Sequence, residues 1–440
     1  MADTPSPVEL LQALIRFDTS NPPGNERACL EHVAGLLSEA GVEHRFVASA
    51  PERPNLVARV PGRGDAPPLL LYGHVDVVPA DPAEWAHPPF GGEVIDGEVW
   101  GRGALDMKGG VAIMLAALLA AARWETPPAG DLVLMLTSDE EAGSLPGMKF
   151  LVEEHPELFA GIRFGISEFG GFTQWHGSHR FTPIQVAEKQ RCLIRATIRG
   201  KGGHAASVVR GTASGKAGRL LQTLATRRLP VHVTPVARQM IEAMAGALPL
   251  HERAGLRALL VPALTDRLLD LIGEGGAPLD PLLHNTATPT VLAGGQVTNV
   301  IPTEITIDLD GRVLPGSSPR ALVAELEALA PGLAEYEIVR EEPPAAGQPD
   351  LALFPLLEQV SREKDPGATP IPMLLSGYTD ARYVSQLGIQ TYGYLPMKLP
   401  RHITTKLVHA ADERVTVDAL EFGVDCLGEV LRRYERPTGS

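Results

Sequence analysis

The chain has 440 residues, in which 39 Lys and Arg face 53 Asp and Glu, so its formal net charge is −14. A protein that binds nucleic acid or an anionic membrane surface needs a basic field, and this charge argues against both partners. Aromatic residues make up only 5% of the chain, which disfavours a stacking surface for single strands. At roughly 150 residues per domain, the length predicts two or three domains.

Three cysteines, Cys29, Cys192 and Cys426, lie far apart and form no CxxC pair. That pattern argues against a disulfide framework and against a thiolate zinc site. Residues 1–10 contain no basic segment followed by an apolar one, so no signal peptide is predicted. The longest apolar run, 111–122, is shorter than the roughly 20 residues of a membrane span. We therefore expect a cytoplasmic protein.

Helical and strand patterns alternate along the first part of the chain. Helices are predicted near 8–15, 30–41, 108–123 and 147–154, and strands at 55–60, 68–78 and 132–137. Such alternation indicates an α/β fold with a mostly parallel central sheet and helices on both faces.

The pattern changes after about residue 188. Strands at 191–199, 304–310 and 335–340 and helices at 216–227 and 319–330 indicate a small αβ sandwich, with a mostly helical insert at about 232–286. A helix at 352–363 and a strand near 389–395 restore the first pattern. We therefore predict a discontinuous domain of residues 1–188 and 346–440, interrupted by an inserted domain of residues 189–345.

Polar residues follow the predicted buried strands. His74 and Asp76 lie near the end of the strand at 68–78. Positions i and i+2 of a strand face the same side, so the Asp76 carboxylate can orient the His74 imidazole toward a metal. The alternative is a His–Asp hydrogen bond that serves only the fold.

Acidic residues gather at equivalent places farther along the chain. Three adjacent acids, residues 139–141, follow one buried strand, and Glu168 follows another short apolar segment. Asp106 lies in a glycine-rich segment before an apolar helix, where an N-cap is its alternative role. Acids beside buried strands are costly unless they are solvated or bind a cation. Because ligands bind at the carboxyl ends of strands, these residues predict a site for zinc or a similar divalent ion.

The ordered motifs resemble a known family, the co-catalytic zinc hydrolases that include aminoacylase, acetylornithine deacetylase, succinyl-diaminopimelate desuccinylase and glutamate carboxypeptidases. The motifs are SNPPG at 20–24, GHVD at 73–76, GRGALDMKG at 101–109, DEE at 139–141, GGHA at 202–205, NVIP at 299–302, and His409 followed by Asp412 and Glu413. The resemblance covers nearly the whole chain. It implies a zinc-peptidase catalytic domain interrupted by an αβ lid and dimerisation domain.

The resemblance also implies two zinc ions per subunit, for which Co²⁺ or Mn²⁺ are possible substitutes. It gives Asp106 as the bridging ligand, His74 and Glu141 as ligands of one ion, and Glu168 and His409 as ligands of the other. The sequence leaves open which ion takes Glu141 and which takes Glu168.

Two details of the ligand set come from the same resemblance. His402 competes with His409 as the last ligand, but only His409 is followed by the AADE segment that the family shows. A cis peptide bond is implied between Asp106 and Met107.

Three catalytic residues are implied as well. Asp76 would support His74, and Glu140 would be the general base. His204 would stabilise the oxyanion from the inserted domain, at the active site of the other subunit of a homodimer. The alternative for His204 is a turn histidine after residues 201–203.

The residues that would bind the substrate resemble the family less closely. Asn299, Arg312 and Gly377 lie in segments similar to those that hold the substrate, and the planar fork of Arg312 suits a carboxylate. A surface arginine is the alternative. Tyr378 replaces the small residue that usually precedes Thr379 in the family.

We therefore expect a zinc-dependent hydrolase that cleaves the amide bond of N-acyl amino acids or short peptides with a free carboxylate. In the family, a glutamate at the position of Glu168 is typical of deacylases and carboxypeptidases, and an aspartate of di- and tripeptidases. The alternatives are a dipeptidase and, from a different class, a catalytically silent metal-binding relative. The presence of Glu140 and Asp76 argues against a silent relative.

Overall fold

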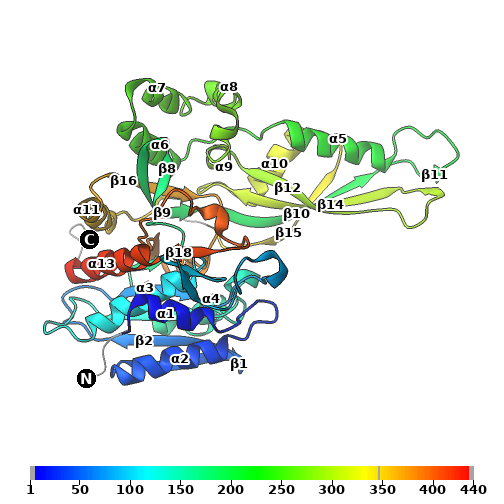
Figure 1. Ribbon diagram of the computed structural model, residues 1–440. Helices are drawn as coiled ribbons and strands as arrows, with labels where there is room; N and C mark the ends of the chain where they lie inside the picture. Colours follow the sequence, from blue (N-terminus) through cyan, green and yellow to red (C-terminus); the bar gives the residue numbers. More distant parts are fainter. Residues whose placement is uncertain (1–4, 345–346, 436–440) are drawn as a thin grey trace. The chain divides into compact units, whose positions relative to one another are not determined.

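The structure, a computed structural model, describes residues 5–344 and 347–435 (Figure 1). Of these, the residues up to Val186, Pro349–Met373 and those from Thr379 onward form one compact unit. The residues of Ala187–Gln348 and Leu374–Tyr378 form the other. The predicted domain limit at 188/189 stays a prediction, and the limit at 345/346 lies outside the described residues.

One short segment differs from the expected division of the chain. Leu374–Tyr378 belongs to the second unit, although the sequence pattern places all of 346–440 in the first domain. The reason is a backbone contact, because the Lys189 amide donates a hydrogen bond of 3.1 Å to the Leu375 carbonyl. The segment therefore runs beside the start of the second unit.

The first unit is built on a nine-stranded sheet in the order β1–β2–β6–β3–β7–β17–β9–β16, with β8 paired to β9. The strands are β1 (Glu43–Ala50), β2 (Arg53–Val60), β3 (Leu69–His74), β6 (Leu132–Thr137), β7 (Phe164–Ser167), β8 (Gln174–His176), β9 (His179–Glu188), β16 (Ala368–Leu375) and β17 (Gln390–Gly393). The central strands β6, β3, β7 and β17 pair in parallel, whereas β1, β2 and β9 join in antiparallel fashion. The α/β class with a mostly parallel centre is thus confirmed.

Helices pack on the sheet because this contact buries the apolar residues of both. The helix α3 (Lys108–Ala121) is buried along nearly its whole length and packs against α1 (Pro7–Ile15) and α13 (Val417–Arg433). A separate core cluster joins residues of β3 and β6 to α4 (Met148–Glu154) and α12 (Ala381–Val384). Two further helices, α2 (Glu26–Glu39) and α11 (Phe354–Lys364), pack on β2 and on α13.

A three-stranded sheet lies close to the glycine-rich segment. It has the order β18–β5–β4, with strands β4 (Glu93–Ile95), β5 (Glu98–Trp100) and β18 (Arg414–Thr416). Because β18 follows residues 409–413 directly, this sheet fixes that segment beside residues 101–106. The backbone contact is a hydrogen bond of 2.9 Å from the Gly101 amide to the Glu413 carbonyl.

The second unit is an antiparallel sheet, β12–β14–β10–β15, that packs on two helices. Its strands are β10 (Gln190–Arg199), β12 (Thr286–Ala293), β14 (Glu304–Val313) and β15 (Glu335–Glu341), and the helices are α5 (Ala213–Thr226) and α10 (Pro319–Leu329). Strands β10 and β14 pair over ten residues, from Gln190 opposite Val313 to Arg199 opposite Glu304. A short pair, β11 (Gly203–His204) and β13 (Val300–Ile301), extends beyond the Arg199 end.

A helical segment completes the second unit, with α6 (Pro235–Ala247), α7 (Leu250–Ala258), α8 (Pro262–Ile272) and α9 (Asp280–Leu283).

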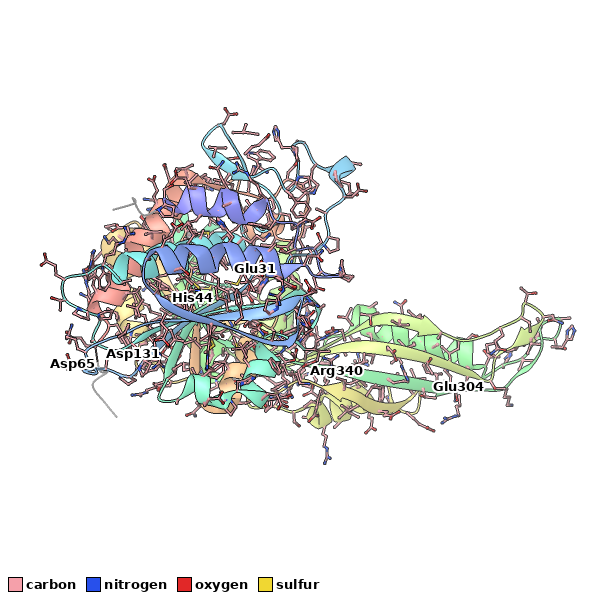
Figure 2. All side chains as sticks on the ribbon, turned by 90° about the horizontal axis from the view of Figure 1, so that it is seen from below. Glu31, His44, Asp65, Asp131, Glu304 and Arg340 are labelled. Carbon is pink, nitrogen blue, oxygen red and sulfur yellow. The ribbon has the colours of Figure 1, made fainter. Side chains whose placement is uncertain are left out.

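Charged residues such as Glu31, Asp65 and Glu304 are exposed and lie at the outside of the ribbon (Figure 2). In the part of the chain that the structure describes, no helix combines the length and apolar character that a membrane crossing needs.

Candidate metal centre

The central strands end beside one another at the same edge of the sheet. His74 is the last residue of β3 and lies opposite Thr137, the last residue of the parallel strand β6. The neighbouring parallel strand β7 ends at Ser167, so Glu168 leaves the sheet at the same edge. The buried apolar strands therefore deliver a histidine and several acids to one place, as ligand sites in α/β sheets require.

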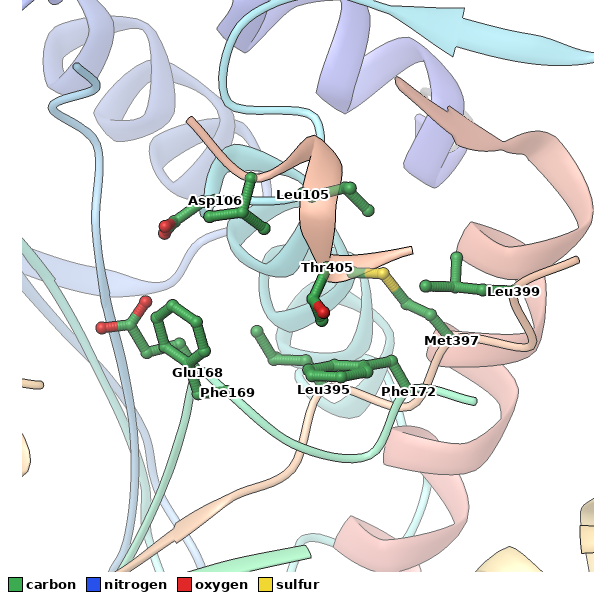
Figure 3. A pocket seen from close by; sticks show the side chains of 10 residues that line it. Leu105, Asp106, Glu168, Phe169, Phe172, Leu395, Met397, Leu399 and Thr405 are labelled. Carbon is green, nitrogen blue, oxygen red and sulfur yellow. The ribbon is translucent and has the colours of Figure 1, made fainter. Parts of the chain in front are cut away.

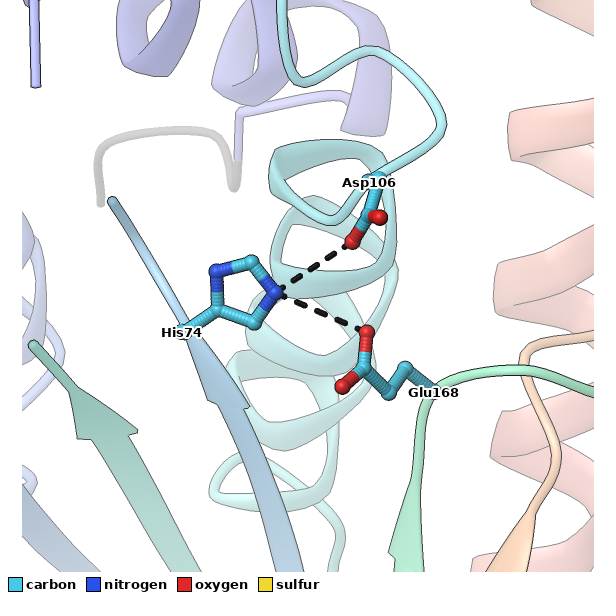
Figure 4. A group of neighbouring side chains, drawn as sticks. All are labelled: His74, Asp106 and Glu168. Carbon is cyan, nitrogen blue, oxygen red and sulfur yellow. Dashed lines mark ion pairs between the residues drawn. The ribbon is translucent and has the colours of Figure 1, made fainter. Parts of the chain in front are cut away.

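His74, Asp106 and Glu168 form the first group of potential ligands (Figure 4). The Nε2 atom of His74 lies 3.3 Å from Asp106 Oδ1 and 3.5 Å from Glu168 Oε2. All three side chains are at most 6% exposed.

Asp106, Glu141 and His409 form the second group. His409 Nε2 lies 3.2 Å from Asp106 Oδ2 and 3.1 Å from Glu141 Oε1. The two oxygens of Asp106 therefore face different groups, which is the arrangement that a bridging carboxylate needs. The His409 side chain is 48% exposed, so this group is the more open of the two.

The grouping corresponds to the exchange of Glu141 and Glu168 that the sequence left open. His74 lies with Glu168, and Glu141 lies with His409. His402, the alternative last ligand, lies 2.6 Å from Glu98 and belongs to neither group.

The donor set fits divalent cations. Two atoms that each lie about 2.0–2.2 Å from one tetrahedral ion are about 3.3–3.6 Å apart, close to the distances within both groups. His74 Nε2 and Glu168 Oε2 are buried and have no hydrogen-bond partner among the described residues. Nitrogen and oxygen donors without a thiolate suit zinc and its neighbours. Cys29, Cys192 and Cys426 are all free and buried.

The raised pKa values of two potential ligands also favour a bound cation. Burial raises the pKa of Glu168 to about 8, while Asp106 and Glu141 raise the pKa of His409 to about 10. When carboxylates and imidazoles lie close together and no other cation balances the negative charge, their pKa values rise and they keep their protons. A bound metal ion would take the place of those protons.

Asp76 contacts both His74 and the acidic turn, residues 139–141. It lies two residues beyond the end of β3, and the closest acceptor for His74 Nδ1 is the Asp76 backbone carbonyl at 2.9 Å. The Asp76 carboxylate is 3.5 Å from the same nitrogen. It also accepts hydrogen bonds of 3.1 and 3.2 Å from the amides of Glu140 and Glu141. Asp76 therefore links His74 to the acidic turn.

Glu140 lies at the centre but in neither ligand group. Its side chain is 12% exposed, and Oε1 lies 3.7 Å from Nη1 of the buried Arg382. Burial, together with the charge of Glu168, raises the pKa of Glu140 well above its ordinary value. A buried carboxylate with a raised pKa that lies outside both ligand groups has the properties of a general acid–base group.

The glycine-rich segment is held by Glu413, a carboxylate with no exposed surface. It accepts hydrogen bonds of 2.7 to 3.0 Å from the amides of Gly103, Leu105 and Asp106 and pairs with Arg102 at 2.7 Å. The Asp106–Met107 peptide bond is cis, which confirms that implication of the resemblance. The N-cap of α3 is Met107, so the capping alternative for Asp106 does not apply.

A further chain of polar contacts reaches the acidic turn from α2 and β2. Glu26 is fully buried and lies 2.5 Å from Arg53, which donates a hydrogen bond of 2.7 Å to Asp139. Asn21 donates to both Asp139 and Asp76, at 3.0 and 2.8 Å. Asp139 has a φ of 70°, a left-handed conformation that such contacts stabilise.

His204 and Asn299 lie at one end of the second unit. His204 is exposed in β11, and its Nδ1 accepts a hydrogen bond of 3.1 Å from the Ala206 amide. The Asn299 carbonyl accepts one of 3.0 Å from the Ala205 amide.

Arg312 lies near the other end of β14. Its Nε donates a hydrogen bond of 2.5 Å to Asp310, and its guanidinium stacks on the ring of Tyr378, the residue after Gly377. Asn299 and Arg312 are thus separated by most of the length of β14, roughly 25 Å at 3.3 Å per residue. The structure brings Arg312 to Tyr378, the neighbour of Gly377, and His204 close to Asn299, but it does not bring these two pairs together.

Sequence reasoning gave no role to Arg53, Glu26, Arg382 and Glu413. A signal existed for Glu413 and Arg102, because both lie inside motifs that carry the family resemblance. Arg53 and Glu26 lie outside any motif, and only the folded chain shows that they are paired.

Comparisons with known proteins identify the family of the chain. The model of the peptidase family M20/M25/M40 matches residues 70–433. A succinyl-diaminopimelate desuccinylase of Methylobacterium sp. (strain 4-46) is 31% identical over 447 residues, which cover 98% of this chain and 96% of the relative.

Two solved structures share the fold. The M20 family metallo-carboxypeptidase Sso-CP2 of Sulfolobus solfataricus has a TM-score of 0.68 at 16% identity, covering 97% of this chain and 99% of that chain. The YXEP protein of Bacillus subtilis, a dinuclear metal binding peptidase, has a TM-score of 0.61 at 13% identity, covering 97% and 96%. The chain described here belongs to the hydrolases of peptidase family M20/M25/M40.

Proposed function

We propose that this chain is a zinc-dependent hydrolase that cleaves the amide bond of N-acyl amino acids or short peptides with a free carboxylate. The observation that carries the proposal is Asp106, whose two oxygens face two separate ligand groups, with Glu140 beside them as a carboxylate of neither group. Glu168 also supports a deacylase or carboxypeptidase, since relatives with free-amine substrates tend to have aspartate there.

In this proposal His74, Asp106 and Glu168 hold one ion, and Asp106, Glu141 and His409 hold the other. Two bound ions supply Lewis acidity, which activates water and polarises the substrate carbonyl. Glu140 takes the proton from the attacking water and delivers it to the leaving amine. Arg382 keeps the Glu140 carboxylate in place, and Asp76 keeps the backbone of the turn in place.

The free carboxylate of the substrate is assigned to Arg312. Its Nη1 is buried and has no hydrogen-bond partner among the described residues, while Nε is held by Asp310. A guanidinium fixed at one edge with a donor left over suits a carboxylate. Gly377, the residue before Tyr378, belongs to the same assignment. Asn299 lies beside His204 instead and is proposed, like His204, to contact the substrate in the active site of the partner subunit.

His204 is proposed to stabilise the oxyanion in the active site of the partner subunit of a homodimer. Strand β10 runs over ten residues from Gln190, three residues after the second unit begins at Ala187, to Arg199. The His204 hairpin follows that far end, roughly 30 Å along the strand. His204 is exposed there, as a residue that acts in another subunit must be.

The test uses protein loaded with zinc and a panel of N-acyl amino acids and dipeptides. Wild type is expected to release the amino acid from at least one class. Glu140→Gln should keep its metal content and lose at least the roughly 10²-fold in turnover that general-base catalysis contributes. Glu153→Gln, an exposed glutamate on α4, is the matched control and should leave turnover unchanged.

Two results would contradict the proposal, and a third would favour one of its alternatives. Loss of metal in Glu140→Gln would show that Glu140 is a ligand and that the base lies elsewhere. Metal-loaded wild type without activity on any member of the panel would favour a catalytically silent relative. Cleavage of dipeptides alone would favour the dipeptidase alternative.

A further inference from the structure

The cavity beside the metal centre offers no cation to the free carboxylate of the proposed substrate (Figure 3). Its volume is about 30 Å³, room for one or two water molecules. Asp106 and Glu168 are among the ten residues that line it, and none of the ten is Lys, Arg or His. A cationic side chain for the carboxylate therefore lies elsewhere, in agreement with its assignment to Arg312 in the second unit.

Arg191 and Arg312 lie directly opposite each other on the neighbouring strands β10 and β14. The residues next to them, Cys192 and Val313, are buried in the apolar core of the second unit. Because successive side chains of a strand alternate, both arginines project from the other face of the sheet. Like charges directly opposite each other destabilise a sheet, so this pair needs anions to balance it.

Asp310 is the acid that both arginines share. It accepts hydrogen bonds from Arg191 Nε at 2.9 Å and from Arg312 Nε at 2.5 Å. Arg195, on the same face of β10, instead binds both oxygens of its own partner, Asp308, at 2.7 and 2.9 Å. Two guanidinium groups on one carboxylate leave one positive charge over, which a second carboxylate would balance.

Other charged residues nearby do not remove this excess. The Glu342 amide donates to the Arg191 carbonyl at 2.9 Å, but its carboxylate lies 2.7 Å from Arg340. Lys189 is a further basic residue, and its Nζ donates to two backbone carbonyls at 3.0 and 2.8 Å. Burial and then the charge of Arg312 lower the pKa of Lys189 to about 7. This end of the sheet is therefore positive, although the whole chain has a net charge of −14.

Tyr378 contacts both guanidinium groups and belongs to the same unit. The central carbons of Arg191 and Arg312 lie 5.6 and 4.7 Å from the centre of its ring, and Arg191 Nη1 donates a hydrogen bond of 3.4 Å to its hydroxyl. Cation–π contacts of this kind hold a guanidinium in place. The family resemblance implies a small residue at this position, so the contact is a feature of this chain and not of the motif.

Donors remain for a ligand. Arg312 Nη1 is buried and has no hydrogen-bond partner among the described residues. The Arg191 side chain is 35% exposed, so a ligand can reach it.

We propose that Arg191, Arg312 and Tyr378 form a two-arginine clamp, in which both arginines bind the free carboxylate of the substrate. The inference rests on the proposed function, which assigns that carboxylate to Arg312 alone. The Tyr378 ring keeps the two guanidinium groups in place. Arg191 and Tyr378 then determine specificity, because a neutral carboxamide leaves both arginines without their second anion.

The experiment compares N-acetylleucine with N-acetylleucinamide on zinc-loaded protein. Both contain the same acetyl amide, so release of acetate measures the same reaction, and only the charge at the other end differs. Wild type should have the higher kcat/KM for N-acetylleucine. Arg191→Met should lower that kcat/KM about ten- to hundred-fold, the range of one hydrogen bond to a charged group, and should change the value for the carboxamide by less than about three-fold.

Arg195→Met is the matched control, because Arg195 lies on the same strand and face and is also paired with an aspartate of β14. It should keep the preference for the carboxylate. Arg191→Met should fold, since Asp310 keeps Arg312 as its partner. An equal loss on both substrates would show that Arg191 only supports the fold, and would overturn the inference. An unchanged preference would overturn it as well.

Two variants test the ring. Tyr378→Phe keeps the cation–π contacts and should keep the preference, whereas Tyr378→Ala should lower it by about five-fold or more, as the loss of two such contacts implies. A preference in Tyr378→Ala equal to that of wild type would overturn the role of the ring.

A binding measurement separates this inference from the proposed function. Titration calorimetry gives the Kd of both compounds even where neither is hydrolysed. Because a carboxylate can also bind zinc directly, the difference between Arg191→Met and Arg195→Met carries the test.

The outcomes are distinct. If no amide is hydrolysed but Arg191→Met binds N-acetylleucine about ten-fold or more weakly than Arg195→Met, the proposed function fails and the clamp stands. If hydrolysis is observed and the two variants bind N-acetylleucine equally, the proposed function stands and the clamp is overturned. Wild type that binds N-acetylleucine no more tightly than N-acetylleucinamide would also overturn the clamp.

Discussion

Arg53 is expected to stabilise the acidic turn by compensating two buried carboxylates. Its side chain is 19% exposed, that of Glu26 is 0% and that of Asp139 is 6% exposed. The replacement Arg53→Met keeps much of the length of the side chain but leaves both acids without their cation. Breaking a buried pair in this way costs about 3–5 kcal/mol of the free energy of unfolding.

This cost converts into a melting temperature. For a domain of 150–250 residues, 1 kcal/mol corresponds to about 2–4 °C, so Arg53→Met should melt roughly 6–20 °C below wild type. Scanning calorimetry or near-ultraviolet circular dichroism measures the difference. Arg59→Met is the matched control, because Arg59 lies in the same strand, is 45% exposed and pairs with Asp131 at the surface. A surface pair is worth about 1 kcal/mol or less.

The pH dependence of stability shows whether the uncompensated carboxylate of Glu26 causes the loss. Burial raises the pKa of Glu26, and Arg53 opposes that rise. Without Arg53 the native pKa moves farther above the unfolded value, so the native state of the variant binds more protons than the unfolded state over that window. Stability of the variant therefore falls as the pH rises through it. The deficit relative to wild type should be larger at pH 8 than at pH 5.

Activity provides a second measurement. Arg53 holds Asp139, the residue before the proposed base Glu140, so the variant should lose turnover while its metal content stays nearly complete. A melting temperature within 2 °C of wild type, or a deficit that is the same at pH 5 and pH 8, would refute the role of Arg53 as the counter-charge.

Three further predictions concern other parts of the molecule. Asp106→Ala should abolish binding of both zinc ions in titration calorimetry, whereas His409→Ala should lose one; equal stoichiometry in the two variants would contradict the bridging role. A mixture of His204→Ala and Glu140→Gln should regain activity after subunit exchange, because one mixed site has both groups; no recovery would exclude action in the partner subunit. Burial lowers the pKa of Lys189 to about 7, so the unfolded chain binds more protons between about pH 7 and 10 and wild type should gain stability over that window. Lys189→Met should remove that gain, and an unchanged slope in denaturation against pH would contradict it.

Several elements could be predicted from the sequence because one signal dominated each. Strand β6 matches the predicted range 132–137, since an apolar run bounded by polar residues has few alternatives. Helix α3 ends at Ala121, two residues before the predicted end. The strand predicted at 68–78 ends at His74, because the chain turns there to place Asp76 under the acidic turn.

Other elements were not predicted. Helix α13 had a signal, with Thr416 as N-cap and buried residues such as Leu420 and Leu427 at helical spacing. Strand β9 gave a weaker signal because it contains Pro183, and proline is uncommon inside a strand. The contacts of Arg53 join residues 27 and 86 positions away, and no local pattern encodes such pairs.

The potential ligands are held in place by hydrogen bonds to the main chain. Asp76 and Glu413 each accept hydrogen bonds from two or three backbone amides of the segments that carry Glu141 and Asp106. Bonds to the main chain do not depend on which side chains the bonded residues carry. The neighbouring side chains can therefore change while Glu141 and Asp106 keep their places.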